Sequence, residues 1–125
     1  MINIFINTLK NTPAVTTLVD ADNIFPLFRL QGSSMPCIVV QLVQTIPVDT
    51  HDQAPSLDTH TVEVTTFHTT PLGAWKIANE IRNAYERFTD SDGIDQIRFV
   101  TQATDIFEVT EAHSITQRYE CHQNR

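Results

Sequence analysis

Glycine is scarce in this chain, with only three glycines among 125 residues. Loops that cradle phosphate groups need several closely spaced glycines, so the chain offers little material for a nucleotide-binding turn. The sequence also lacks G-x-S-x-G, H-E-x-x-H and G-x-G-x-x-G, the motifs of common hydrolases, metalloproteases and dinucleotide-binding enzymes. Nothing in these patterns points to an active site.

Cysteine is rarer still, and neither Cys37 nor Cys121 belongs to a C-x-x-C pair. Both lie in apolar or strand-like segments, which favours buried thiols over metal ligands. A disulfide between them would require that their two strands pair.

The five histidines do not cluster at the spacing of metal ligands. His60 and His68 share a strand face, but at the rise of a strand they stand about 27 Å apart, too far to bind one ion. A zinc site that combined His113, His122 and a distant partner is the alternative. We therefore expect no metal and no cofactor.

Clusters of Lys or Arg are absent, and 8 basic against 15 acidic side chains give a net charge of −7. Binding to the phosphates of nucleic acid requires a basic face, so this class of function is disfavoured. An acidic wall would instead let DNA pass without holding it. The start, MINIFINTLK, has neither the basic region nor the long apolar run of a signal peptide or membrane span, so no membrane association is expected.

What the chain does have is clear apolar periodicity. Ile2, Phe5, Ile6 and Leu9 follow the i, i+3, i+4, i+7 pattern of an amphipathic helix, and Pro13 suits the start of a second one. Alternation and β-branched residues predict strands at 37–44, 59–69, 94–110 and 113–122, and a short edge segment at 23–30.

The order of these elements predicts an α+β fold over a single domain, residues 1–125. We expect a mostly antiparallel sheet of four to five strands. One long helix and the N-terminal helix should pack on one face of it.

The long helix is expected within HTTPLGAWKIANEIRNAYERF, residues 68–88, with Thr70 as N-cap and Pro71 in the first helical position. Gly73 would let this helix approach the sheet closely. Aromatic residues at helical spacing could line a ligand pocket, but a continuous apolar stripe favours a core. That stripe is predicted to consist of Trp75, Ala78, Ile81, Ala84, Tyr85 and Phe88.

A long polar segment, TIPVDTHDQAPSLD, separates the strands at 37–44 and 59–69. A hairpin needs only two to five residues here, so the excess predicts a projecting arm or a binding loop at about 45–58. The candidate subunit-interface residues are Pro47, Asp49, His51, Asp52, Pro55 and Asp58.

In combination these segments resemble the tail-terminator and tail-completion proteins of long-tailed bacteriophages, also called head–tail joining proteins. The strand PCIVVQLV matches the family's P-x-hydrophobic-x-hydrophobic-Q strand through Pro36 to Gln41, and THTVEVTTFHTT matches its V-x-V strand. The closing strand carries an Arg-aromatic pair at Arg118 and Tyr119. The family's helix rhythm is supplied by Ala74, Ile77, Ala78, Ile81, Arg82 and Ala84.

The resemblance spans nearly the whole chain and implies a structural virion protein, without enzymatic activity, that is assembled in the host cytoplasm. Such a subunit forms a homo-hexameric ring that caps the tail tube and docks it to the head connector. Its implied partners are further copies of itself, the tail tube protein and a head-completion or connector protein, while DNA passes through the lumen without specific binding. The loop at 45–58 departs from the tight hairpin of a minimal member.

Two other functions fit the same fold. A cytoplasmic adaptor or small-ligand-binding module would use a similar α+β sandwich. An enzyme would need convergent titratable groups, for example His68, His113 and an acid within hydrogen-bond reach.

Overall fold

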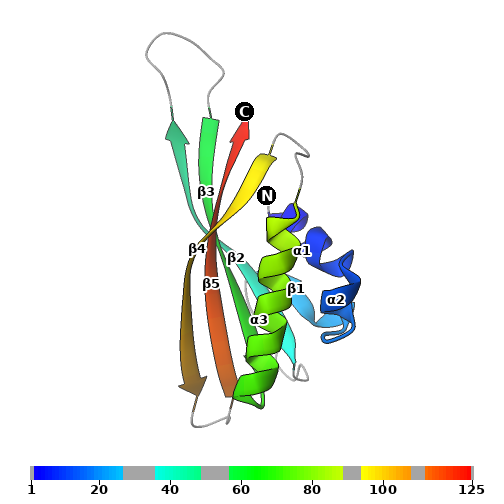
Figure 1. The fold of residues 1–125 in the computed structure, drawn as a ribbon. Coiled ribbons are helices and arrows are strands. Elements are labelled where there is room, and N and C mark those ends of the chain that lie inside the picture. Colours follow the sequence, from blue (N-terminus) through cyan, green and yellow to red (C-terminus); the bar gives the residue numbers. More distant parts are fainter. Residues whose placement is uncertain (1, 27–35, 49–56, 89–93, 108–111, 125) are drawn as a thin grey trace.

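Five strands form one sheet in the computed structural model, which describes residues 2–26, 36–48, 57–88, 94–107 and 112–124 (Figure 1). The strands are β1 (Ile24–Pro26), β2 (Cys37–Val48), β3 (Leu57–His68), β4 (Ile94–Phe107) and β5 (Ala112–Asn124). The helices are α1 (Ile2–Lys10), α2 (Pro13–Thr16) and α3 (Pro71–Glu86), with a 3₁₀ turn, η1 (Ala21–Asn23), before β1.

The order of strands in the sheet is β1-β2-β3-β5-β4. Only the short β1 runs parallel to its neighbour, β2, and the other pairs are antiparallel. The expected fold class, a mostly antiparallel sheet in an α+β protein, is thereby confirmed. The last strand, β5, lies in the interior of the sheet between β3 and β4, which the order of elements alone does not reveal.

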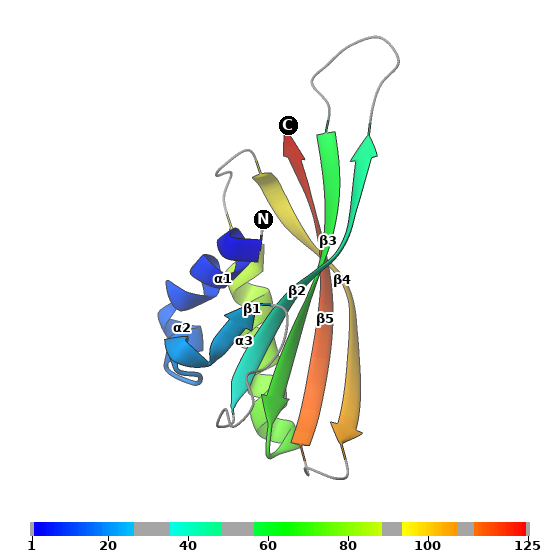
Figure 2. The same cartoon turned by 180° about the vertical axis from the view of Figure 1, so that it is seen from behind.

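All three helices lie on one face of the sheet, and the opposite face carries no helix among the described residues (Figures 1 and 2). Alternation places Val62 and Val64 of β3 toward the helices, where both are fully buried. Phe5 and Leu9 of α1 are also fully buried, as the helical periodicity predicts.

Aromatic stacking joins the helices to the sheet. The ring of Tyr85 in α3 stands edge-on to Phe5 of α1, 5.0 Å between centroids, and to Tyr119 of β5 at 4.8 Å. The Tyr85 hydroxyl donates a hydrogen bond to the Phe5 backbone carbonyl at 3.1 Å. Edge-to-face pairs and a satisfied buried hydroxyl make Tyr85 the contact that fixes α3 against both α1 and β5.

The start of α3 follows the predicted capping chemistry. The Thr70 hydroxyl accepts a hydrogen bond from the Gly73 backbone N–H at 3.1 Å, and Pro71 occupies the first turn. The close approach expected at Gly73 is to the His68 side chain, because a Cβ at this position would overlap the imidazole ring. The Thr70 backbone N–H in turn donates to His68 Nδ1 at 3.0 Å.

The hairpin between β2 and β3 has longer strands than the sequence analysis assigned. Residues 45–48 and 57–58, placed there in the loop, belong to β2 and β3. The ladder continues through Pro47 opposite Asp58 to Val48 opposite Leu57. A register shift at Val43 breaks the apolar alternation of β2, and a proline argues against a strand, so the sequence pattern stops before the strand does. Thr45 Oγ1 lies 2.9 Å from His60 Nδ1 in this added part.

Two of the long strands, β2 and β4, pair irregularly with their neighbours. The register of β2 shifts between Leu42 and Gln44, and that of β4 shifts between Phe99 and Thr101. The residues left over, Val43 and Val100, are both exposed. Bulges of this kind bend a strand and increase its twist, and the sheet twists strongly near its middle (Figure 1).

Polar side chains are also fully buried where α3 crosses the sheet, and Gln117 is the one with hydrogen bonds to both layers. Gln117 of β5 donates through Nε2 to the Ala78 carbonyl at 3.0 Å and to Gln102 Oε1 at 3.1 Å. Its own Oε1 is buried and has no hydrogen-bond partner among the described residues. The Ala78 carbonyl of α3 thus accepts a hydrogen bond from a side chain of the sheet.

Candidate functional site

Two of the six predicted interface residues lie in the described strands β2 and β3. Pro47 in β2 and Asp58 in β3 are directly opposite each other in the ladder. Asp49, His51, Asp52 and Pro55 lie outside the described residues. The described ends of β2 and β3 extend beyond the helical layer (Figures 1 and 2).

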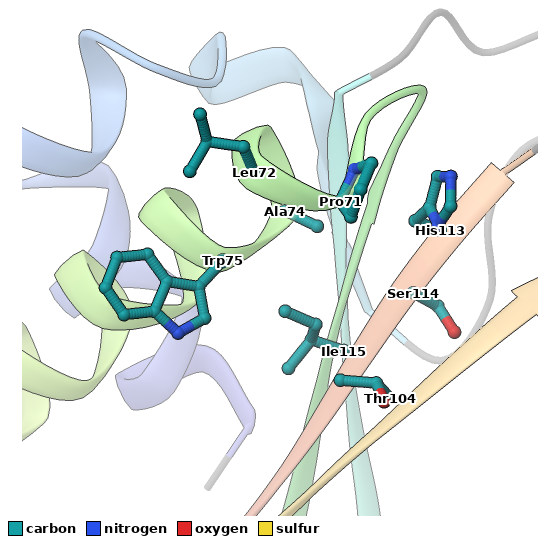
Figure 3. A pocket seen from close by; sticks show the side chains of 8 residues that line it. All are labelled: Pro71, Leu72, Ala74, Trp75, Thr104, His113, Ser114 and Ile115. Carbon is teal, nitrogen blue, oxygen red and sulfur yellow. The ribbon is translucent and has the colours of Figure 1, made fainter.

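A groove of about 460 Å³ opens between the first turns of α3 and the adjacent ends of β4 and β5 (Figure 3). Leu72 and Trp75 form its helical wall, and Ile115 lies on the sheet. The full lining consists of Pro71, Leu72, Ala74, Trp75, Thr104, His113, Ser114 and Ile115. These eight residues are mainly apolar and include no acid.

The position of Trp75 corrects the sequence analysis, which assigned this residue to the core stripe. Its side chain is 52% exposed, and the neighbouring Ala74 is fully buried in its place. Ala74 and Ala78 pack against Ile115, and their small side chains let α3 lie close to the sheet. A tryptophan would not fit at that distance, so Ala74 and Ile77 extend the buried stripe on this flank and Trp75 turns toward the groove. The buried stripe is Ala74, Ile77, Ala78, Ile81, Ala84 and Tyr85.

The same flank of α3 continues along β4. Arg82, two turns after Trp75, places its guanidinium 4.0 Å from the centroid of the Phe99 ring in β4. It also forms an exposed ion pair with Glu86. Arg82 thus closes the space between α3 and β4 beyond the groove, whereas at Trp75 this space stays open.

Histidines meet at the end of the groove. His68 of β3 and His113 of β5 are partners in the ladder, and His113 lines the groove (Figure 3). No group of three or more His, Cys, Asp or Glu side chains that could hold a metal ion occurs within the described part of the chain. The candidate zinc ligand His122 instead lies beside Thr59, toward the other end of the sheet.

The sheet face that carries no described helix is polar along β3 and β5, whereas beside β1 it holds the buried residues Phe25, Cys37 and Val39. An ion pair joins Arg118 of β5 to Glu63 of β3, and the hydroxyls of Thr65 and Thr116 lie 3.1 Å apart. Charges of both signs are paired across the strands, so this face offers no single-sign patch among the described residues.

Both cysteines are buried, as the sequence analysis predicts. Their strands, β2 and β5, are separated in the sheet by β3, so the condition for a disulfide is not met. Burial raises the pKa of the Cys121 thiol from its ordinary value of 9.0 to about 11.

The raised pKa of Cys121 predicts a loss of stability at alkaline pH. The folded protein holds this proton more tightly than the unfolded chain does. The contribution of this group to the free energy of unfolding is therefore complete below pH 9 and is lost as the pH rises toward 11. Cys121→Ala removes the titrating group. The free energy of unfolding that it loses relative to the natural chain should be smaller at about pH 10.5 than at about pH 8. Urea unfolding of both proteins at the two pH values measures this difference. A cost that does not change with pH would contradict the assignment.

Burial also raises the pKa of Tyr85 and that of Tyr119, so both hydroxyls remain protonated in the core. No helix within the described residues has the length and apolar character needed to cross a membrane.

Comparisons with known proteins give one family and one fold. The family model described as "Tail completion protein gp17" matches residues 5–121. A chain of the solved structure described as "Virion of native gene transfer agent (GTA) particle" superposes with a TM-score of 0.73 at 13% sequence identity, covering 97% of this chain and 92% of that one. At this identity the likeness shows a shared fold. No curated protein sequence matches the chain.

Proposed function

The chain belongs to the tail completion protein gp17 family of structural tail proteins, and on this premise we propose that it forms a ring that terminates the tail tube and joins the tail to the head connector. Membership of this family confirms the resemblance found in the sequence. It also makes the chain a structural component of the virion tail and not an enzyme. The proposed ring contains six copies assembled in the host cytoplasm, with the tail tube protein and a head-completion or connector protein as partners.

The observation that carries the ring is that the sheet has two different open edges. At one side β4 pairs only with β5 among the described strands. At the other, β1 covers only Ile38 to Val40 of β2, so the remainder of β2 has no described strand beside it. A ring repeats one heterologous contact, which requires two different surfaces on every subunit. Two unlike edges supply them.

The net charge of −7 is consistent with this role. An acidic ring repels the phosphates of DNA, so the genome would pass through the lumen without binding. We also propose that residues 45–58, in the β2–β3 hairpin, contact a neighbouring copy or the tail tube.

Native mass spectrometry over a range of concentrations, with negative-stain images of the largest species, tests the ring. We expect a six-fold particle with a central hole, either in solution or on the ends of tail tubes added to the chain. A stable dimer that binds a small molecule, with no ring on added tubes, would instead support a ligand-binding module.

Shortening the hairpin tests its role. Val48 and Leu57 are partners in the ladder, so replacing residues 49–56 with Asn-Gly should close a two-residue turn without strain. We expect this variant to fold with little change in melting temperature but to fail to join purified heads to tails made without the chain. A Gly/Ser replacement of 49–56 of equal length separates length from side-chain chemistry. Efficient joining by the shortened variant would refute a role for this tip.

A further inference from the structure

Large exposed apolar side chains gather at two sides of the described fold. Leu72, Trp75 and Val100 lie on α3 and β4, with Trp75 and Leu72 exposed by 52% and 60%. Leu18 and Val43 lie at the opposite side, before η1 and on β2, and are 39% and 42% exposed. The sheet order separates these two sides, because β1 and β2 stand at one edge and β4 at the other.

The two sides differ in charge as well as in position. Beside the groove, Lys76 of α3 is exposed, and residues 71–79 contain no acidic side chain. Beside Leu18, Asp20 and Asp22 are both exposed, and residues 12–26 contain no Lys or Arg. One side therefore offers an apolar groove with an exposed lysine next to Trp75 in sequence, and the other an apolar side chain followed by two acids.

We propose that these two sides bind each other between copies of this chain, with Leu18 of one copy entering the groove beside Trp75 of the next. In this arrangement Asp20 and Asp22 face Lys76 across the contact. The inference rests on the proposed ring and assigns the surfaces that form it.

A second copy is the occupant that these observations favour, because the groove and a complementary segment occur on the same chain. A two-fold contact centred on the groove would place the groove against another groove and Lys76 near another Lys76. A heterologous contact avoids this repulsion and brings opposite charges together, which sets both the partner and its orientation. It also places the bulged edge of β4, with Val100, on the side that approaches β2 and Val43 of the neighbour.

Crosslinking between two singly substituted chains tests the contact directly. One chain carries Leu18→Cys and the other Leu72→Cys; both positions are exposed, whereas the natural Cys37 and Cys121 are buried. The chains are mixed in equal amounts, alone and with tail tubes, and oxidised. We expect the mixed disulfide to exceed that of a control pair, Leu18→Cys with Asn83→Cys, by roughly tenfold, because docking raises the effective concentration of the two thiols.

The control position Asn83 is exposed on the same helix, away from the groove. Circular dichroism of each variant checks that it is folded. Rings that form while the mixed disulfide stays at the control level would overturn this contact and leave the proposed function intact. Absence of both rings and mixed disulfide would overturn the contact and the ring together. A disulfide between two Leu72→Cys chains that exceeds the mixed one would also overturn it, in favour of a two-fold contact.

Charge reversal provides a second test that needs no cysteine. Lys76→Glu alone, and Asp20→Lys with Asp22→Lys, should each weaken association by about two- to fivefold per contact, the range of exposed ion pairs. The combined variant restores opposite charges and should recover association. Reversal of Lys10, a basic residue of α1 away from the groove, is the matched control. If association of the combined variant is weakened by as much as the two separate reversals together, the two surfaces do not meet.

Discussion

Replacing Tyr85 with alanine should lower the free energy of unfolding by about 4 kcal/mol, within the range measured for loss of a buried aromatic side chain. Tyr85 is fully buried and joins α3 to α1 and to β5 through its contacts with Phe5 and Tyr119. Alanine removes both edge-to-face contacts and leaves a cavity in the main core. Urea unfolding followed by circular dichroism measures the effect.

Tyr85→Phe separates the hydroxyl from the ring. The Phe5 carbonyl lies inside α1 and is also used by the helix, so loss of the hydroxyl leaves no orphaned acceptor and should cost only about 1 kcal/mol. Lys76→Ala, on the exposed side of the same helix, is the control and should change stability little. A cost for Tyr85→Ala close to that of Tyr85→Phe would show that the aromatic cluster is not the main link between the helices and the sheet.

Gln117→Glu should destabilise the fold near pH 8 by roughly 3–5 kcal/mol, as expected when a buried charge has no partner. The amide nitrogen of Gln117 donates to two oxygens, those of Ala78 and Gln102. A carboxylate in the same place would face both as an acceptor. Thermal and urea unfolding report the loss.

The pH dependence of this variant has a defined sign. Burial raises the pKa of the introduced carboxyl above its value in the unfolded chain, so the protonated form is favoured in the folded state. As the pH falls toward about 5, the introduced carboxyl gains a proton that it can donate to the Ala78 carbonyl, and the deficit relative to the natural chain should shrink. Gln117→Met is the control, because it removes the orphaned amide oxygen with the donor and should change stability by only about 1 kcal/mol. An equal deficit at both pH values would contradict this account.

Apolar periodicity was sufficient to predict most of the fold. The pattern at Phe5 and Leu9 located α1, and Val62 and Val64 marked the buried face of β3. The ends of the β2–β3 hairpin were missed because a register shift at Val43 breaks the alternation of β2 and Pro47 argues against a strand. Strand order was also beyond reach, since alternation states which face is buried but not which strand is the neighbour.

The groove could not be predicted because its position depends on how α3 is rotated on the sheet. The helical spacing of Trp75 suggested a core residue, but the close packing of Ala74 and Ala78 on Ile115 leaves Trp75 exposed. Gln117, by contrast, had a usable signal. It lies in phase with Ile115, Tyr119 and Cys121, all of them buried, so the period of two already placed it in the core.

The place of β5 within the sheet also bears on how the chain folds during synthesis. Thr59 pairs with His122, 63 residues later, and β4 has no described partner other than β5. The ribosome must therefore release nearly the whole described sequence before β3 and β4 can be joined. Contacts between such distant residues give a high contact order, so we expect folding on the slow, millisecond-to-second scale rather than in microseconds. Until β5 is inserted, the edges of β3 and β4 are unprotected, and translation that stops before residue 112 leaves a chain that cannot complete this sheet.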